Sequence, residues 1–287
     1  MNTTLPPVKT VPARDGTPLA FRRWPPPSAA RRGTILIVHG LGEHCGRYGG
    51  VADDLRGRGW AVVAYDQRGH GLAGGERGGL RRPDDLLLDL ATIVDHVHTG
   101  EPGIGAPHPP LLLLGHSMGG VLAAQFVARS MRPVDGLVLS SPALDPGLSR
   151  RQRIQLAIGS ALVPGLAQSN QLDPTRISHD PAVVRAYIED PLVHDRVTAR
   201  LARAIVHGGA EVLRAASAWQ MPTLLMWAGS DRLVSPAGSA AFAAAAPASL
   251  VHAKCFEPLY HEILNEADVE PVLAELHRWL DRHYPAG

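Results

Sequence analysis

Five short, almost continuously apolar segments constrain the fold of this chain more than any other feature. They lie at residues 34–38, 61–65, 111–114, 137–139 and 223–227. Strands that are buried on both faces have this composition, as in a parallel sheet covered by helices. The sequence therefore predicts a central sheet whose two faces are both shielded from water.

The intervening segments have helical periodicity. Residues 84–98 place leucine, isoleucine and valine on one helical face, and residues 269–280 repeat the pattern near the end of the chain. Ser235-Pro236 provides a helix start before an alanine-rich run, and Asp15-Gly16 is a two-residue turn signal for an opening hairpin. Alternation of strands and helices over most of the chain predicts a doubly wound α/β fold, mostly parallel and flanked by helices.

Residues 145–220 interrupt this alternation. The segment contains no convincing central strand, and prolines divide it into helical or irregular pieces, at Pro164, Pro174, Pro181 and Pro191. About 75 residues is too long for a simple connection between two strands. We therefore predict a core formed by residues 1–144 and 221–287, with residues 145–220 inserted as a helical cap over the carboxyl ends of the strands, where ligands of such sheets bind.

The composition excludes several classes of protein. Of the 287 residues, 45% are hydrophobic, and 28 basic against 27 acidic residues give a net charge of +1. Without a concentrated basic stripe, a nucleic-acid partner is not expected. Two cysteines, no apparent signal peptide and no long apolar span favour a cytoplasmic protein.

A G-x-S-x-G motif lies between an expected strand and an expected helix. Gly115, Ser117 and Gly119 follow four leucines and precede an apolar run. This is the context of the nucleophile turn of α/β hydrolases, in which glycines leave room for strand and helix to approach closely around a strained serine. The motif predicts the α/β-hydrolase fold, with Ser117 as the nucleophile.

A serine hydroxyl needs a base to remove its proton, and the base needs an acid to orient it. In this fold the acid and the histidine follow the serine on loops after later strands. Asp231 directly follows the strand at residues 223–227, and His261 lies before the last helix, so we predict that they are the acid and the base. Asp145, after the preceding strand, is the alternative acid.

The backbone N–H groups of Leu41 and Met118 are the predicted oxyanion donors. Met118 follows the nucleophile, and Leu41 lies in the loop after the strand at residues 34–38. The chemistry requires no metal and no organic cofactor, and no cysteine–histidine cluster with metal-ligand spacing is visible in the sequence.

Several motifs together resemble the monoacylglycerol lipases and related lysophospholipases, over about residues 34–280. They are HGLGEHCGRY, YDQRGHG, LLGHSMGG, DPLVH, AGSD and YHEILNE. The resemblance implies that Glu43 and Arg47 border a polar subsite for the alcohol half of the substrate, with a structural ion pair as the alternative. Vertebrate members carry a second histidine where this chain has Leu264, so the polar subsite is expected to be incomplete.

The predicted function is hydrolysis of fatty acyl esters, such as monoacylglycerols, through an acyl-enzyme. Alternatives on the same triad are a lysophospholipase, an acyltransferase or an S33-type aminopeptidase, and a non-catalytic binding protein is the alternative of another class. The expected partner is a small lipid or ester substrate, with no obligate protein partner. The apolar stretch at residues 154–167 is expected to cover the acyl pocket, or alternatively to contact a membrane surface transiently.

Overall fold

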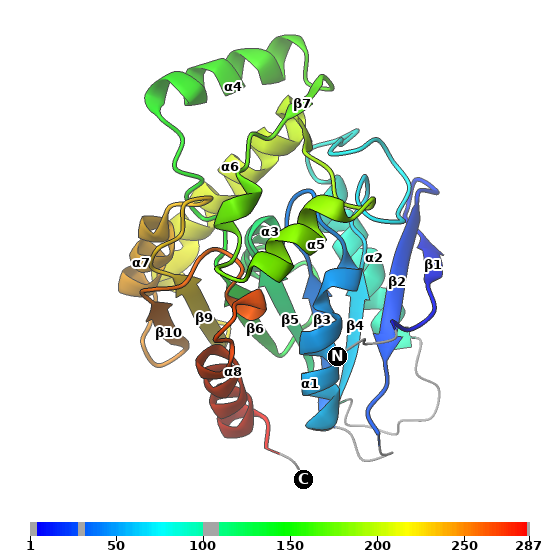
Figure 1. Ribbon diagram of the computed structural model, residues 1–287, viewed down its shortest axis with the longest axis vertical. Coiled ribbons are helices and arrows are strands. Elements are labelled where there is room, and N and C mark those ends of the chain that lie inside the picture. The colour runs from blue at the N-terminus through cyan, green and yellow to red at the C-terminus, as the bar shows by residue number, and fades with distance from the viewer. Residues whose placement is uncertain (1–4, 28–31, 100–108, 286–287) are drawn as a thin grey trace.

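The computed structural model describes residues 5–27, 32–99, 109–285, and its centre is an eight-stranded sheet (Figure 1). The strand order is β1-β2-β4-β3-β5-β6-β9-β10. In that order the strands span Lys9–Pro12, Pro18–Trp24, Trp60–Tyr65, Gly33–Val38, Leu111–His116, Gly136–Ser140, Thr223–Ala228 and Val251–Phe256. Six strands are parallel, and β2 is antiparallel both to β4, the outermost of the six, and to β1, its partner in the hairpin. The ranges 1–4, 28–31, 100–108 and 286–287 of the predicted core lie outside the described residues.

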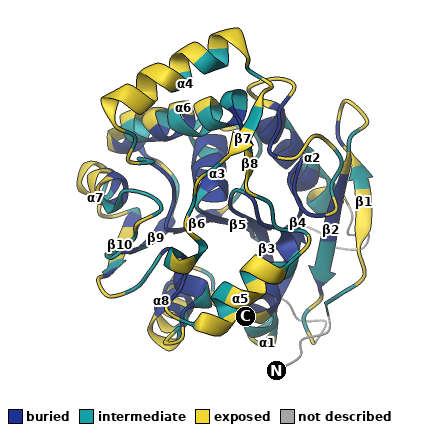
Figure 2. Ribbon diagram, turned by 45° about the horizontal axis from the view of Figure 1, so that its top comes forward, coloured by how far each residue is buried: buried dark blue, intermediate teal, exposed yellow. Residues whose placement is uncertain are grey.

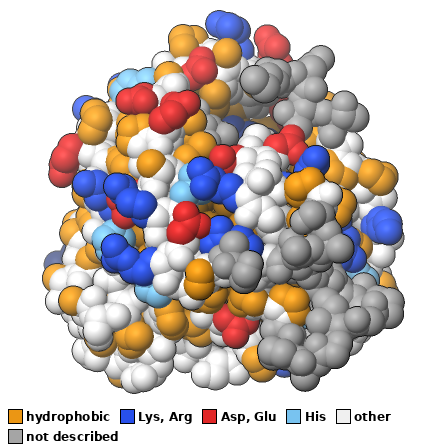
Figure 3. All heavy atoms as spheres, turned by 90° about the horizontal axis from the view of Figure 1, so that it is seen from below, with side chains coloured by type: hydrophobic (Ala, Val, Ile, Leu, Met, Phe, Trp, Pro, Cys, Tyr) orange, Lys and Arg blue, Asp and Glu red, His pale blue; other side chains and the backbone are white. Residues whose placement is uncertain are grey.

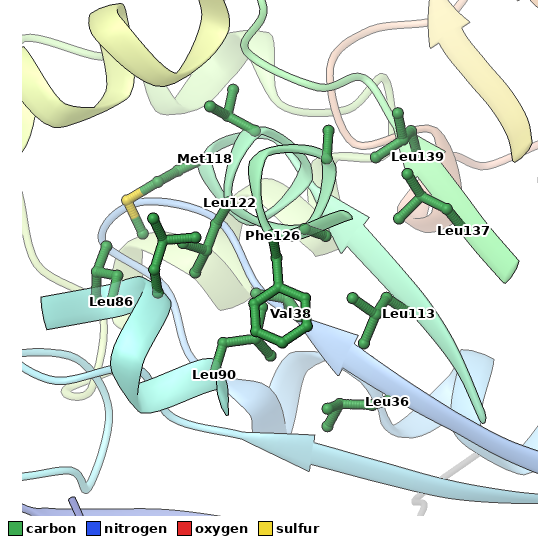
Figure 4. Packing of buried hydrophobic residues seen from close by; sticks show 14 of the residues in the cluster. Leu36, Val38, Leu86, Leu90, Leu113, Met118, Leu122, Phe126, Leu137 and Leu139 are labelled. Carbon is green, nitrogen blue, oxygen red and sulfur yellow. The ribbon is translucent and has the colours of Figure 1, made fainter. Parts of the chain in front are cut away.

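Two layers of helices cover the sheet, as expected from strands buried on both faces. Helices α1 (Gly49–Gly57) and α8 (Glu270–His283) pack on one face, and four helices pack on the other. Those four are α2 (Asp85–Thr99), α3 (Met118–Ala128), α6 (Ala199–Ala215) and α7 (Pro236–Ala245). Alternate residues of β3 serve the two layers: Leu36 and Val38 contact the α2–α3 side, while Ile35 and Ile37 contact the α1–α8 side (Figure 4).

The strands, helices and opening hairpin predicted from the apolar pattern are confirmed. The turn at Asp15-Gly16 forms with Gly16 at a positive φ of 83°, which glycine adopts without strain. β10 lies at the edge of the sheet, so its central residues are exposed rather than buried. Acidic and basic side chains are interspersed on the face opposite α4 (Figure 3).

The segment 145–220 crosses the carboxyl-end side of the sheet. Besides α6 it contains α4 (Arg150–Leu162), α5 (Pro181–Glu189) and a small hairpin of β7 (Ala167–Ser169) with β8 (Arg196–Thr198). Among the described residues, 3-10 turns lie at Cys45–Tyr48, Pro174–Arg176, Ala216–Ala218 and Ile263–Asn265. The last part of the segment is core, because Val212, Ala216 and Trp219 are fully buried against the sheet layer.

Helix α4 corrects the prediction that its apolar residues cover the acyl pocket. Its apolar residues Ile154, Ile158 and Leu162 are 52%, 54% and 76% exposed, and no residue of the helix is buried (Figure 2). Spaced by four, they form one stripe. The helix packs along α6 on one side only and directs this stripe to solvent, so these three residues do not cover an acyl pocket. None of the helices over the described residues is long and apolar enough to cross a bilayer.

Candidate active site

Ser117 lies in a tight turn between β5 and α3. Its φ of 53° and ψ of −119° are strained for a residue with a side chain, and the turn is held by a 3.0 Å hydrogen bond from its N–H to the Ser140 carbonyl. Gly115 is needed beside it, since a Cβ there would lie 2.5 Å from the Gly119 carbonyl oxygen. This strand–turn–helix geometry is the one predicted for the nucleophile.

His261 and Asp231 form a buried pair. Nδ1 of His261 donates to Oδ2 of Asp231 at 2.6 Å, and their side chains are only 6% and 1% exposed. Oδ1 of Asp231 accepts from the backbone N–H groups of Leu233 and Val234 at 2.8 and 3.1 Å. The carboxylate is therefore fixed from both sides. Asp145, the alternative acid, instead accepts from Gly147 N–H and pairs with Arg153.

The electrostatics of this pair suit a base that works near neutral pH. Burial alone lowers the pKa of His261, but the Asp231 carboxylate beside it raises the pKa above its usual value. Burial raises the pKa of Asp231, and His261 and two backbone donors outweigh it, so the pKa falls below its usual value. Burial lowers the pKa of His116, whose ring lies 4.8 Å from that of His261, to about 4. His116 is consequently neutral at pH 7 and adds no charge next to the base.

The predicted oxyanion donors border the same cavity as Ser117 and His261. Met118 is the first residue of α3, where backbone N–H groups have no acceptor within the helix. Leu41 lies in the loop that follows β3. Leu41 and Met118 thus line the cavity that Ser117 and His261 also line, and the role of their N–H groups as oxyanion donors stays a prediction.

The cavity has a volume of about 180 Å³ and mostly apolar walls. Besides the four residues above, it is lined by Ala143, Pro146, Leu148, Asn170, Leu172, Val197, Ala202, Ile205, Val206, Leu233 and Val234. Of these, Asn170 is the polar side chain. An apolar cavity of roughly 150 Å³ holds a six-carbon ring, so this one has room for a similar number of carbon atoms. Over the described ranges, no group of three or more His, Cys, Asp or Glu side chains is arranged to hold a metal ion.

Glu43 and Arg47 form a buried ion pair behind this cavity rather than part of its lining. Arg47 Nη1 donates to Glu43 Oε2 at 2.7 Å, and Glu43 Oε1 accepts from Tyr48 Oη at 2.7 Å and from Gly40 N–H at 2.5 Å. Burial alone raises the pKa of Glu43, but Arg47 and other neighbours lower it to about 2. With both carboxylate oxygens engaged by protein donors, this geometry favours the structural ion pair. A role in alcohol binding stays a prediction.

Glu262 is the residue that sequence analysis missed. It follows His261 directly and accepts two hydrogen bonds from Arg47, both at 2.7 Å. The guanidinium also lies 4.7 Å from the ring centre of Tyr187 in α5. One arginine thus connects the loop of Leu41, the loop of His261 and the inserted segment. The sequence contained a signal for this role of Glu262. It is an acidic residue directly after the predicted base, in a chain that also places Arg47 four residues after Glu43.

Two other residues from the sequence motifs, Leu264 and Asp66, stabilise the fold and do not line the catalytic cavity. Leu264 is 7% exposed and packs in the core cluster on the α1–α8 side of the sheet. Asp66, in the YDQRGHG motif, accepts from the backbone N–H groups of Cys45 and Leu72, both at 2.8 Å. The motif is therefore a structural turn at the end of β4.

The sheet order and the strained serine turn define the class: the chain has the α/β-hydrolase fold. The family model described as serine aminopeptidase, S33, matches residues 29–268. The chain belongs to this family.

Relatives within the class are named for ester hydrolysis. The chain is 34% identical over 271 residues to a monoacylglycerol lipase of Mycolicibacterium smegmatis, covering 93% of this chain and 94% of the relative. The crystal structure of Paleococcus ferrophilus monoacylglycerol lipase is 31% identical, with a TM-score of 0.82 over 92% of this chain and 99% of that chain. A soluble variant of monoglyceride lipase from Saccharomyces cerevisiae, solved with a substrate analog, shares the fold at 23% identity, with a TM-score of 0.86 over 99% and 97% of the two chains. The chain is accordingly a carboxylic ester hydrolase.

Proposed function

We propose that the protein hydrolyses medium-chain acyl esters, including monoacylglycerols, through an acyl-enzyme on Ser117. The observation that carries the proposal is the buried 2.6 Å contact between His261 and Asp231, with His261 on the wall of the apolar cavity that Ser117 also lines. Two of the relatives above 30% identity are named monoacylglycerol lipases, and these names supply the substrate class.

In the proposed reaction, Ser117 Oγ attacks the ester carbonyl carbon and its proton passes to Nε2 of His261. The carbonyl oxygen becomes an oxyanion that accepts from the N–H groups of Leu41 and Met118, each of which contributes on the order of 100- to 1,000-fold in rate. Collapse breaks the ester bond, and the alcohol leaves with the proton from His261. Water then attacks the acyl-enzyme, gives a proton to His261, and releases the fatty acid as Ser117 recovers its proton.

The cavity suggests a preference on the acyl side and little on the alcohol side. Its volume of about 180 Å³ suits a chain of medium length, and each buried methylene stabilises binding by about 0.8 kcal/mol. Glu43 and Arg47 have their hydrogen-bonding groups engaged by protein, which leaves Asn170 as the polar side chain on the wall. We expect weak discrimination between glycerol esters and simple alcohol esters.

A panel of p-nitrophenyl esters and monoacylglycerols of increasing chain length tests this function. We expect kcat/KM to rise by up to roughly fourfold per added carbon until the cavity is full. Activity confined to acetyl esters would contradict an acyl site. Adding a competing alcohol or an amino-acid amide distinguishes the acyltransferase and the aminopeptidase suggested by the family description, and a phospholipid substrate distinguishes the lysophospholipase.

We also propose that the part of residues 145–220 that precedes α6 forms a cap, and that α4 contacts a lipid surface within it. The exposed stripe of Ile154, Ile158 and Leu162 lies next to the exposed Arg150 and Arg151, and apolar plus cationic residues on one helix are what an anionic membrane surface attracts. Replacing Ile158 and Leu162 with serine should weaken cosedimentation with phosphatidylglycerol-containing vesicles while leaving hydrolysis of p-nitrophenyl butyrate unchanged. Unchanged cosedimentation would refute this contact.

A cytoplasmic location in lipid metabolism completes the proposal. Cys45 is buried and Cys255 is half-buried, and neither forms a disulfide, as suits a reducing compartment. Cell fractionation of the native host tests it.

A further inference from the structure

A second, larger hollow borders α6 and shares one wall residue, Val206, with the catalytic cavity. It has a volume of about 730 Å³ and is bordered by α2, α3, α4 and α6. We call it the basic groove. Its lining residues are Pro83, Asp84, Leu87, Gln125, Arg129, Ser160, Pro164, Arg200, Arg203, Ala204, Val206, His207, Ala210, Glu211 and Arg214. Ser117, Asp231 and His261 are not among them, so the proposed reaction gives this hollow no role.

Positive charge predominates in the basic groove. Four arginines face two carboxylates, of which Glu211 is occupied by Arg129 at 2.7 Å. Arg203 donates to Ser160 Oγ at 3.1 Å and Arg200 to the Leu80 carbonyl at 2.5 Å, both uncharged acceptors. Across the part of the chain that the structure describes, Arg200, Arg203 and Arg214 have no carboxylate within 4.0 Å. The groove therefore has an excess of two positive charges. Arg214 interacts electrostatically with Glu211, whereas the acceptors of Arg200 and Arg203 are uncharged.

The placement of these arginines follows from the two faces of α6. Leu201, Gly208 and Val212 are buried against the core, while Arg200, Arg203, His207, Glu211 and Arg214 recur at intervals of three or four on the groove side. Guanidinium groups match carboxylate and phosphate oxygens with paired hydrogen bonds. A helix that presents several of them to one hollow is suited to an anionic headgroup.

Apolar surface lies beside the charge. Leu87, Ala204 and Val206 line the basic groove, and Val206 also lines the catalytic cavity. Between the two hollows lies a small apolar seam of about 20 Å³, whose walls include Met118 and Ile205 of the catalytic cavity. Figure 4 shows Leu86 of α2 facing Met118 and Leu122 of α3, three of the side chains that close this seam. The seam is too small for an acyl chain, so a ligand of the groove is separate from the substrate.

We propose that the basic groove binds a single-chain anionic amphiphile, a carboxylate or phosphate headgroup on an alkyl tail. The headgroup is held by Arg203, while Arg214, about three turns further along α6, adds positive charge at the other end of the groove, and the first methylenes lie on Leu87, Ala204 and Val206. The ligand is thereby distinguished from an ester substrate by its charge and from inorganic phosphate by its tail. This inference goes beyond the proposed function and does not depend on Ser117 chemistry.

Binding of decanoate, decyl phosphate and decanol to the intact protein, measured by calorimetry below the concentrations at which they form micelles, tests the site. In the double variant Arg203→Gln/Arg214→Gln we expect at least about tenfold weaker binding of one or both anionic ligands, because charge-assisted hydrogen bonds are lost. Decanol, which has no charge for the arginines, should bind both proteins equally. Loss for decanoate alone identifies a fatty acid site, and loss for decyl phosphate alone identifies a phosphate-headgroup site.

The matched control is Arg14→Gln/Arg58→Gln, which removes the same charge from exposed positions outside the groove. It should leave binding of both anions unchanged. Equal weakening in the two double variants would mean non-specific charge attraction and would overturn the proposal, as would unchanged affinity in Arg203→Gln/Arg214→Gln. Hydrolysis of p-nitrophenyl butyrate should be unchanged in both variants, which separates failure of this site from failure of the proposed reaction.

Discussion

Replacing Asp231 with asparagine exchanges one carboxylate oxygen for an NH₂ group. The hydrogen-bonding neighbours of residue 231 decide which of the two oxygen positions the NH₂ group takes. Oδ1 of Asp231 accepts from two backbone N–H groups, of Leu233 and Val234. Those donors require an oxygen, so the asparagine NH₂ must face Nδ1 of His261. Nδ1 then accepts instead of donating, and the proton of the neutral ring moves to Nε2. The ring can no longer accept a proton from Ser117.

The expected loss is roughly 10⁴-fold in kcat, about 5 kcal/mol of transition-state stabilisation. KM should change little, because the aspartate itself is not on the cavity wall, although its neighbours Leu233 and Val234 are. The fold should be retained, since the two side chains have the same shape. The matched control is Asp145→Asn, whose side chain is 34% exposed and pairs only with surface groups, and we expect a change within about twofold.

The assay is kcat and KM on p-nitrophenyl butyrate, with the rate of labelling by a fluorophosphonate probe as an independent measure of Ser117 reactivity. Circular dichroism and melting temperature establish that each variant is folded. An Asp231→Asn variant with a tenth or more of the wild-type kcat would refute the tautomer argument. A larger loss in Asp145→Asn than in Asp231→Asn would move the acid to the preceding strand.

Three further predictions follow from the same site. Ser117→Ala should lower ester hydrolysis by roughly 10⁵- to 10⁶-fold with the fold intact, and retention of a tenth of the activity would exclude this serine as nucleophile. The kcat/KM of the wild type should rise with pH, because only neutral His261 accepts the proton from Ser117. Since Asp231 raises the pKa of His261, the midpoint of this rise should lie above about 6.5. A profile that is flat from pH 4 would contradict a histidine base. Glu262→Gln should lower the free energy of unfolding by about 3 kcal/mol, since buried Arg47 loses a charged partner. The control Glu189→Gln, at an exposed position, should lower it by less than about 0.5 kcal/mol. Equal values for the two variants in denaturant titrations would argue against a stabilising role of the buried Arg47–Glu262 pair.

The sheet could be predicted, and the candidate catalytic residues could be proposed, because their signals are local. An apolar run of four or five residues is enough to indicate a strand buried on both faces, and G-x-S-x-G between strand and helix indicates a strained turn from its own residues. His261 and Asp231 were found by their place after particular strands, since the carboxyl ends of parallel strands meet at one edge of the sheet. In each case the information lies within a few residues of the group concerned.

The direction of the α4 stripe was not predictable. Ile154, Ile158 and Leu162 have the spacing of a buried helical face, and nothing in that spacing says whether the core or the solvent lies opposite. Only the packing of α4 along one side of α6 decides it.

The same holds for charges that meet across the fold. Arg47 and Glu262 are 215 residues apart in the chain, and their contact at 2.7 Å exists because the loops after β3 and β10 converge. Arg129, just after the end of α3, borders one hollow with Arg203 and Arg214 of α6 for a similar reason, since two helices from distant parts of the chain pack side by side. The sequence alone determined the fold class and pointed to the candidate reacting groups, because local patterns specify secondary structure and turns. Which charges are paired, and which stay free to meet a ligand, was decided by tertiary packing, because an electrostatic partner is defined by distance in space rather than along the chain.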